Sequence, residues 1–290
     1  MEEVNEKSEF KILGISIWNI FAYFIVFCIL GFLLETVYAF VTKGVVESRQ
    51  GFIYGPFCPI YGVGGVFFAV FLQYFKKNNF TLFFGGMIIG SIVEYLVSFI
   101  GEILFNVKWW DYSYMRFNIN GRICLLYSIF WGLLAIPFMK IVYVYIQNFV
   151  NYLEKRLGCV RYKKVTAVCM MFMMCNCFMT MFALKVFSNR LIYTYDIDVA
   201  NKEEIAQEYQ KLVSNEKLKA FTDKVFSNEK MLRTFPNLKI TKQDGTKEFA
   251  SSYITNITPY YYKLKPENET LIYKLSKIKE RIINKVIWFK

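Results

Sequence analysis

The feature that most limits how this chain can fold is a long apolar run near its start. Residues 15–40 contain no charged side chain until Glu35. About 20 consecutive apolar residues are enough for a helix to cross the roughly 30 Å of hydrocarbon in a bilayer. The run is too long for a signal peptide and lacks a basic start and a small-residue cleavage site. We therefore expect a retained transmembrane helix.

Four further segments have the composition of membrane-spanning helices. They occupy residues 56–75, 80–105, 122–145 and 165–187. Together with the first run, they predict an all-α polytopic membrane protein that crosses the lipid bilayer about five times. Residues 1–14 then form an N-terminal tail, and residues 15–187 form the transmembrane domain.

The rest of the chain differs sharply in composition. Residues 188–290 carry 19 of the 35 Lys and Arg residues and 13 of the 23 Asp and Glu residues. About a third of the chain therefore holds more than half of the charges, which excludes a single soluble domain. We expect residues 188–290 to form a soluble, basic and mostly helical C-terminal region.

Three local patterns add detail to this region. Residues 201–204 (Asn-Lys-Glu-Glu) have the spacing of a capping box at the start of a helix. Asp244 and Gly245 separate two short runs that are typical of strands, which predicts a hairpin. Residues 267–290 have apolar side chains at helical spacing and a basic opposite face. Such a helix lies on an anionic membrane surface, pairs with another helix, or presents a solvated face.

The composition also limits the chemistry. The chain contains no His, which removes the usual general base, Ser-His and Cys-His catalysis, and the commonest metal ligand. Its seven Cys residues are odd in number and lie in the apolar part, unlike a disulfide framework. We expect no enzymatic activity, cofactor, metal ion or nucleic-acid partner. A membrane enzyme that uses its carboxylates for acid–base work is a third alternative.

Basic residues in the short loops indicate the orientation in the membrane. One side carries Lys7, Lys11, Lys76, Lys77, Lys155, Arg156, Arg161, Lys163 and Lys164. The other side carries Lys43, Arg49, Lys108 and Arg116, with Arg122 at the edge of a helix. Because cytoplasmic loops are enriched in Lys and Arg, we expect a cytoplasmic N-terminus and an extracytoplasmic C-terminal tail.

A row of small and acidic residues follows one side of the third predicted helix. Gly86, Gly90, Glu94, Ser98 and Glu102 are spaced four apart. Residues four apart stay on one side of a helix, so the row should face other helices rather than lipid. The glycines either serve only close packing or belong to a functional face. We expect Glu94, near the middle of the membrane, to face an internal polar cavity or to bond neighbouring groups.

Two of the acids share their membrane face with a cation. Glu35, Glu102 and Arg122 come from three different predicted helices and approach the same side. Arg can clamp a carboxylate with two hydrogen bonds. We therefore predict that Arg122 neutralises at least one of the two acids. The group is either a structural ionic lock or part of a ligand site, and both readings can hold together.

The start of the second predicted helix is broken by Gly and Pro. Residues 51–65 contain five Gly and two Pro residues. The key positions are Gly51, Gly55, Pro56, Pro59 and Gly62. An irregular backbone at membrane depth is tolerated only where protein or a water-filled cavity covers it, and such segments commonly form substrate sites in transporters. A tight surface loop is the alternative.

The loop before the fourth predicted helix adds polar side chains. Trp109 and Trp110 are typical of the aromatic belt at a membrane interface. Asp111, Asn118 and Asn120 follow them, and the Asn-Gly pair predicts a turn before the helix. We include these three residues in the candidate polar cluster, as substrate-binding or structural groups.

Several ordered motifs are similar to those of a known family. They lie at residues 31–35 (Gly-Phe-Leu-Leu-Glu), 51–62, 94–98 (Glu-Tyr-Leu-Val-Ser), 109–113 (Trp-Trp-Asp-Tyr-Ser) and 117–126. Over residues 20–140 or so, the chain resembles the Putative ABC-transporter type IV permease family (CmpB-like) of Gram-positive bacteria. The resemblance implies a multi-pass permease of the cell membrane.

Two classes of function remain. In the first, the chain is a transport subunit. Because it has no Gly-x-x-x-x-Gly-Lys-Ser/Thr phosphate loop, ATP hydrolysis would come from a separate ATPase subunit. Five helices are few for a complete pathway, so we expect homo- or hetero-oligomerisation. In the second class, the chain is a non-transporting membrane adaptor or sensor whose C-terminal region binds a partner.

Overall fold

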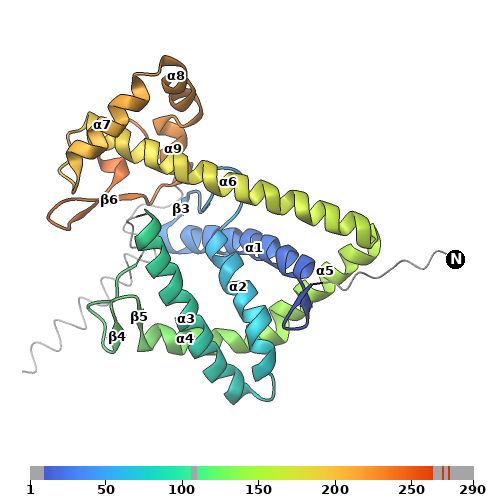
Figure 1. The fold of residues 1–290 in the computed structure, drawn as a ribbon. Coiled ribbons are helices and arrows are strands. Elements are labelled where there is room, and N and C mark those ends of the chain that lie inside the picture. Colours follow the sequence, from blue (N-terminus) through green and yellow to red (C-terminus); the bar gives the residue numbers. More distant parts are fainter. Residues whose placement is uncertain (1–9, 106–109, 264–269, 271–273, 275–290) are drawn as a thin grey trace, which may run out of the picture. The chain divides into compact units, whose positions relative to one another are not determined.

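The computed structural model of the protein describes residues 10–105, 110–263, 270 and 274. In these residues the chain is mostly helical, and its short strands form two-stranded antiparallel pairs. Four of the described helical segments are long and apolar enough to cross a membrane (Figure 1). They are Ile17–Lys43, Asn79–Ile100, Leu125–Leu157 and Cys159–Thr194.

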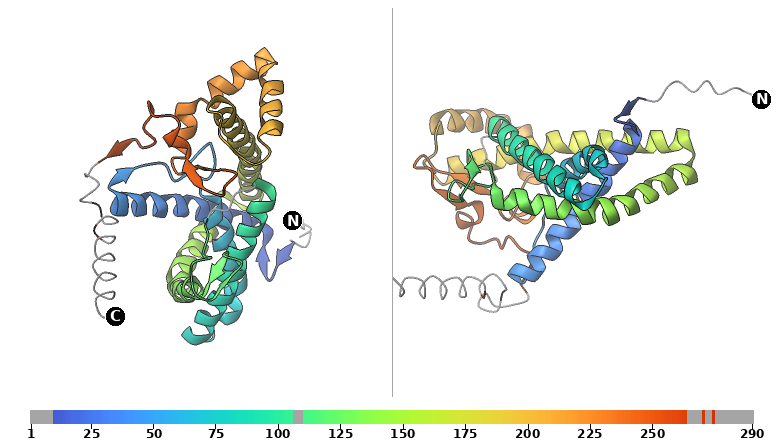
Figure 2. Two further views of the ribbon diagram at one scale, coloured as in Figure 1. Left: turned by 90° about the vertical axis from the view of Figure 1, so that its left-hand side faces the viewer. Right: turned by 90° about the horizontal axis from the view of Figure 1, so that it is seen from below.

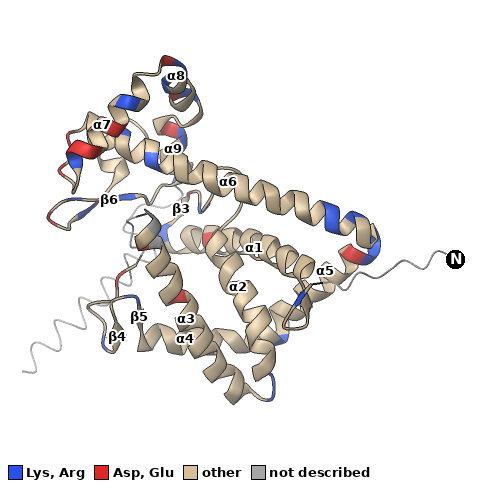
Figure 3. Cartoon of the chain, viewed as in Figure 1, with Lys and Arg blue, Asp and Glu red and all other residues tan. Residues whose placement is uncertain are grey.

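The first and third predicted helices are present with small changes at their ends. α1 comprises Ile17–Lys43, after a small hairpin of β1 (Lys11–Ile12) and β2 (Ile15–Ser16). α3 comprises Asn79–Phe105. Charged residues are sparse along both helices (Figure 3), as a helix in contact with hydrocarbon requires.

The second predicted helix is shorter than residues 56–75. α2 comprises Pro59–Phe71 and continues as a 3₁₀ turn, Leu72–Phe75. Pro59 is the first helical residue, where its missing N–H has no intrahelical partner to lose, and Cys58 before it is extended. This segment falls short of the four long helices, so length alone supports four spans rather than the expected five.

The fourth predicted helix begins at Leu125 rather than at residue 122, so Arg122 lies in a turn before it. The fourth and fifth helices otherwise extend further than expected, into the stretch between residues 145 and 165. α4 (Leu125–Pro137) continues through a π-helical turn (Phe138–Val142) into α5 (Tyr143–Leu157). α6 (Cys159–Thr194) begins directly after Gly158, whose φ of +76° reverses the chain.

Two physical causes explain these longer helices. Pro137 has no N–H to donate, and the π-helical turn that follows it accommodates the missing bond without ending the helix. Beyond it, Tyr143, Ile146 and Val150 are buried at helical spacing. The polar residues on the other face of α5, such as Asn148 and Asn151, made this segment resemble a loop.

The chain divides into two compact units. The first comprises Met1–Gly31 and Cys58–Phe172, and the second comprises Phe32–Phe57 and Met173–Lys290. The second unit thus contains part of the apolar region as well as the charged C-terminal residues. Composition alone placed the boundary between residues 187 and 188.

In the first unit, α3 packs closely against α4 (Figures 1 and 2). A Cβ atom on Gly86 would lie 2.3 Å from the Cβ atom of Ala135, and one on Gly90 would lie 2.5 Å from that of Trp131. A Cβ atom on Gly132 of α4 would lie 2.7 Å from the carbonyl oxygen of Phe83. The glycines of the α3 row therefore serve the close approach of two helices, as small residues do in membranes.

The second unit has its own apolar core around the C-terminal end of α6. Three further helices, α7 (Lys202–Val213), α8 (Glu216–Val225) and α9 (Asn228–Thr234), gather there (Figure 2). Phe187 and Leu191 of α6 are fully buried with Phe226, Met231 and Leu232. The core therefore explains why α6 continues past residue 187 to Thr194.

Two of the three patterns predicted in the C-terminal region can be compared with the structure. β6 (Lys239–Thr241) pairs with β7 (Lys247–Phe249), so the hairpin at Asp244-Gly245 is present. α7 begins at the predicted place, but Asn201 has a φ of +60° and no capping hydrogen bond, so the capping box is wrong. Apart from Thr270 and Lys274, the helix predicted at residues 267–290 lies outside the described residues.

Another strand pair joins segments that are far apart in the sequence. β3 (Val45–Val46) follows α1 directly, and β8 (Tyr262–Lys263) comes near the end of the described residues. The two strands pair antiparallel, with Val45 opposite Lys263 and Val46 opposite Tyr262. Both strands belong to the second unit.

Candidate functional site

The first unit contains a charged cluster centred on Arg122. The guanidinium group forms an ion pair with the carboxylate of Glu102 on α3. Its Nη1 also donates a hydrogen bond to the Ser98 hydroxyl oxygen at 3.2 Å. The rings of Tyr95 and Phe99 lie 5.7 and 5.5 Å from the guanidinium carbon, within cation–π range. The structure thus brings Arg122 together with two members of the predicted row.

A small hairpin before α4 holds Arg122 in place. The strands β4 (Asn118–Ile119) and β5 (Ile123–Cys124) pair antiparallel. The Arg122 N–H donates to the Ile119 carbonyl oxygen at 2.9 Å, and the Trp110 indole N–H donates to the Arg122 carbonyl oxygen at 2.8 Å. The backbone of Arg122 is therefore held on both sides, and its side chain reaches Glu102 and Ser98 of α3.

The three predicted polar residues of this loop have structural partners. The Asn118 side chain accepts a bond from the Gly121 N–H at 3.1 Å and donates to the Met115 carbonyl oxygen at 2.8 Å. Asn120 donates to the Tyr95 hydroxyl oxygen at 2.9 Å, which fixes the hairpin to α3. Asp111 accepts from the backbone N–H of Ser113 at 3.1 Å. These groups shape the loop.

Glu94 lies deeper along the same side of α3. Its side chain is buried and accepts hydrogen bonds from the Tyr112 hydroxyl at 2.9 Å and the Trp131 indole N–H at 3.0 Å. Two donors from the loop and from α4 therefore stand where we expected an internal polar cavity. A buried carboxylate needs such donors, because leaving it without partners is costly.

Tyr112 is well suited to its role as a donor. It stacks on Tyr127 with ring centroids 4.6 Å apart. Burial, followed by the nearby Glu94 carboxylate, raises the pKa of Tyr112 above its usual value. The hydroxyl therefore keeps its proton and stays a donor to Glu94 at any physiological pH.

Glu35 belongs to the other unit. It lies on the C-terminal half of α1, which clusters with the C-terminal residues of the chain. Its pairing with Arg122 stays a prediction, whereas the Arg122–Glu102 pair lies within the first unit.

The irregular segment before α2 closes on itself. The Gly51 N–H donates to the Phe57 carbonyl oxygen at 2.8 Å, and the Gln50 side chain donates to the Gly55 carbonyl oxygen at 2.7 Å. Gly55 has a φ of +78°, a conformation that L side chains rarely adopt. Pro56, which is exposed, follows it directly. The segment is therefore a compact non-helical turn.

Two polar residues of α6, Asn176 and Thr180, cover this turn. The Tyr54 N–H donates to Asn176 Oδ1 at 3.2 Å, and Asn176 Nδ2 donates to the Tyr54 carbonyl oxygen at 2.6 Å. The Ile53 N–H donates to the Thr180 hydroxyl oxygen at 2.9 Å. Neither residue stood out in the sequence as a candidate. Their signal is the spacing of four within an otherwise apolar stretch, which places them on one face of the helix.

Gly62 lies outside this turn and has a different role. It lies within α2, and a Cβ atom there would lie 2.4 Å from the Cys28 sulfur and 2.7 Å from the Phe24 ring. The Cys58 N–H donates to the Cys28 carbonyl oxygen at 2.9 Å. Pro59 and Gly62 therefore start α2 in close contact with the N-terminal half of α1.

A buried cation, Arg190, lies in the C-terminal core. Arg190 near the end of α6 is 8% exposed and forms an ion pair with Asp223 at 2.8 Å. Its guanidinium also donates to the Phe226 carbonyl oxygen at 2.8 Å and to the Asn228 side chain at 3.1 Å. The sequence showed Arg190 only as one of many basic residues.

The two side chains of the ion pair differ in their exposure. The Arg122 side chain is 14% exposed, whereas that of Glu102 is 44% exposed. An acidic group from outside could therefore approach Arg122 from the side of Glu102 and exchange with it. Glu94, in contrast, is closed in by its two donors.

The comparisons with known proteins bear on the family. No curated protein and no solved structure shows significant similarity to the chain. The family described as Putative ABC-transporter type IV matches residues 22–181. This range contains most of α1, all of α2 to α5, most of α6, and both Arg122 and the covered turn before α2. The match extends over more than half of the chain, which therefore belongs to the Putative ABC-transporter type IV family.

Proposed function

We propose that the chain is a multi-pass permease subunit of the cell membrane and that a separate chain hydrolyses ATP for it. The supporting observation is the ion pair between Arg122, in the hairpin before α4, and Glu102, near the C-terminal end of α3, in a member of this family. Charged residues at the ends of membrane helices need partners, and ionisable residues along such helices usually mark a functional path. The substrate would meet Arg122 from the exposed side of Glu102.

The proposal includes five membrane crossings, for which the β3–β8 pair is the support. Because Val46 is paired with Tyr262, both lie on one side of the bilayer. The chain between them must then cross an even number of times. α3, the continuous helix Leu125–Leu157 and α6 supply three crossings. The fourth falls to α2 with its 3₁₀ turn, and α1 makes five.

The length of Pro59–Phe75 is compatible with this role. At about 1.5 Å per residue in the α-helix and 2.0 Å in the 3₁₀ turn, it extends over roughly 27 Å. That is near the lower limit for crossing about 30 Å of hydrocarbon. With a cytoplasmic N-terminus, the C-terminal region is extracytoplasmic, in agreement with the loop charges.

The test is to purify the tagged chain in mild detergent, identify bound chains, and reconstitute it with any ATPase among them. We expect the chain to raise the ATP hydrolysis rate of that subunit, and Arg122→Gln to abolish the increase without preventing association. Lys247→Gln, a substitution at an exposed position of β7, is the matched control. A stable complex without an ATPase would contradict the proposal.

One observation favours the second candidate, a membrane adaptor or sensor. α6 continues without a break from the predicted span at residues 165–187 to Leu191, which is fully buried in the C-terminal core. A continuous helix transmits movement between the membrane and an attached domain more directly than a flexible linker does. Complexes with non-ATPase proteins that depend on residues 188–290 would support this candidate.

A further inference from the structure

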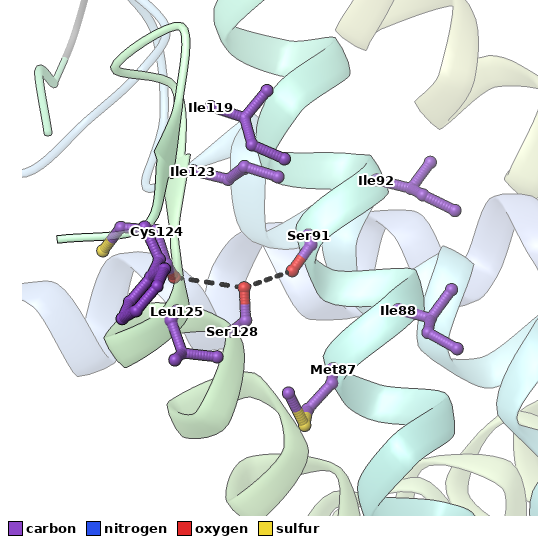
Figure 4. A pocket seen from close by; sticks show the side chains of 10 residues that line it. Met87, Ile88, Ser91, Ile92, Ile119, Ile123, Cys124, Leu125 and Ser128 are labelled. Carbon is purple, nitrogen blue, oxygen red and sulfur yellow. Dashed lines mark hydrogen bonds between the residues drawn. The ribbon is translucent and has the colours of Figure 1, made fainter. Parts of the chain in front are cut away.

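The first unit contains an apolar groove beside the charged cluster. It has a volume of about 500 Å³ and lies between α3 and the junction of β5 with α4 (Figure 4). Ile88, Ser91 and Ile92 of α3 line one wall. Leu125 and Ser128 of α4 line the other. Phe117 and Ile119 of the hairpin complete the lining at one end.

The groove offers hydrocarbon rather than hydrogen bonds to a ligand. Its two serines lie 2.7 Å apart, and the Ser128 hydroxyl donates to the Cys124 carbonyl oxygen at 3.1 Å (Figure 4). Ser91 is therefore the donor to Ser128, and both hydroxyl protons are used within the protein. A polar ligand would lose its own hydrogen bonds to water on entering, whereas an alkyl chain would lose none.

The walls of the groove belong to two segments that are long and apolar enough to cross a membrane. Ile88 and Ile92 are 55% and 50% exposed on the span Asn79–Ile100. Leu125, which is 43% exposed, begins the span Leu125–Leu157. At bilayer depth these surfaces contact acyl chains, so the medium that reaches the groove is phospholipid.

At the hairpin end of the groove, the lining residue Phe117 follows a charged residue in the chain. Phe117 is 78% exposed with a φ of +54°, and Arg116 before it is exposed as well. Among the described residues, Arg116 forms no ion pair. An exposed aromatic residue beside a free cation is typical of the headgroup layer, where Arg binds lipid phosphate.

We propose that the groove binds one acyl chain of an anionic phospholipid whose phosphate contacts Arg116. The charge of Arg116 selects the headgroup, and the apolar walls of α3 and α4 hold the chain. The lipid would contact the same hairpin that carries Arg122. The proposal does not depend on whether the chain is a permease or an adaptor.

The test uses bilayers that contain phosphatidylglycerol or phosphatidylcholine with a photoactivatable group in the acyl chain. After irradiation, labelled positions are mapped by mass spectrometry. We expect phosphatidylglycerol to label residues 87–92 and 123–128 several-fold more than other exposed positions of α3. Ile92→Trp, which fills the groove, should abolish this excess. Ile100→Trp, at a position that is 49% exposed and outside the lining, should leave it unchanged.

The proposed contact between Arg116 and the lipid phosphate is tested separately. Arg116→Gln should lower labelling by phosphatidylglycerol to the level seen with phosphatidylcholine, while the thermal stability in detergent stays at that of the parent. Even labelling along all exposed positions of α3 would show ordinary boundary lipid and overturn the groove. Equal labelling of the parent by both lipids would overturn the role of Arg116.

Discussion

Tyr54 and Asn176 are 122 positions apart in the chain and are joined by two reciprocal hydrogen bonds. The amide group of one side chain on α6 pairs with both the N–H and the carbonyl oxygen of a residue in a non-helical turn. A backbone that leaves helical structure in a membrane protein must find such partners. This relationship therefore explains why the turn before α2 is tolerated.

Replacing Asn176 with Leu should destabilise the protein substantially. It leaves the Tyr54 N–H and carbonyl oxygen without these partners, at a cost of about 1–3 kcal/mol for each group. Thermal unfolding in detergent is the measurement. Cys175→Leu, at an exposed neighbouring position, is the control and should change the midpoint little. Equal midpoints for the two variants would contradict the role of Asn176.

The Arg122–Glu102 pair predicts non-additive losses of stability. We expect Arg122→Met and Glu102→Gln each to destabilise the protein and the double variant to lose less than their sum. Because Glu102 is 44% exposed, the coupling should lie between the 1 kcal/mol or so of an exposed pair and the roughly 3–5 kcal/mol of a buried one.

The same comparison of single and double variants, with Glu35→Gln in place of Glu102→Gln, tests the predicted pairing of Glu35 with Arg122. Strict additivity with Glu102 would show that the ion pair contributes nothing. Additive losses of stability for Arg122 with Glu35, but not for Arg122 with Glu102, would restrict the charged cluster to the first unit. Thermal midpoints of all single and double variants in one detergent provide both comparisons.

Two glycines of α2 provide a matched pair for the close contact with α1. A Cβ atom on Gly62 would lie 2.4 Å from the Cys28 sulfur, whereas one on Gly64 would meet no atom within 4 Å. Gly62→Leu should therefore impair folding, and Gly64→Leu should have little effect. The yield of monodisperse protein and its thermal midpoint measure this difference. Equal tolerance of both changes would mean that α2 is not packed against α1 as described.

Five crossings predict which sites are accessible from outside the cell. Single cysteines at Asn79, Asn151 and Ser252 would be treated with an impermeant thiol reagent, in a background where Cys159 is replaced. We expect labelling of the Ser252 position only. Labelling of the other two positions with protection of Ser252 would reverse the orientation. A further cysteine at Pro56, an exposed position between α1 and α2, should be labelled as well, and equal accessibility of the Pro56 and Asn79 positions would contradict the crossing by α2.

The β6–β7 hairpin should lose stability in acid. Hydrogen bonds from Lys242, and then from Tyr253, lower the pKa of Glu248 below its usual value of 4.5. A lowered pKa in the folded state stabilises the fold at pH values above the usual one, and this contribution is lost as the pH falls through the lowered value. The thermal midpoint of the parent should therefore fall more steeply below about pH 4.5 than that of Glu248→Gln.

Features that depend on local properties of the chain could be predicted from the sequence, whereas features that depend on packing between distant segments could not. Apolar runs indicated α1 and α3 because the length of a helix in hydrocarbon is a local property. The turn at Asp244-Gly245 was also local, and the hairpin is present. α5 was missed because its apolar stripe at Tyr143, Ile146 and Val150 is concealed by polar residues on its other face.

The candidate site shows the same limit. The spacing of Glu94, Ser98 and Glu102 placed them on one side of a helix, and the position of Arg122 made it a natural partner. Which groups bond to Glu94 could not be read in this way. Its donors, Tyr112 and Trp131, come from a loop and from another helix.

The sequence by itself determined that the chain is a helical membrane protein with a charged C-terminal region. Hydropathy and charge act on each segment independently of its neighbours, so they can be read without a fold. The tertiary structure alone decided that Asn176 covers the turn at Tyr54 and that α6 extends into the C-terminal core. These contacts join segments more than 100 residues apart or depend on several helices at once, and such partners are chosen only when the chain packs.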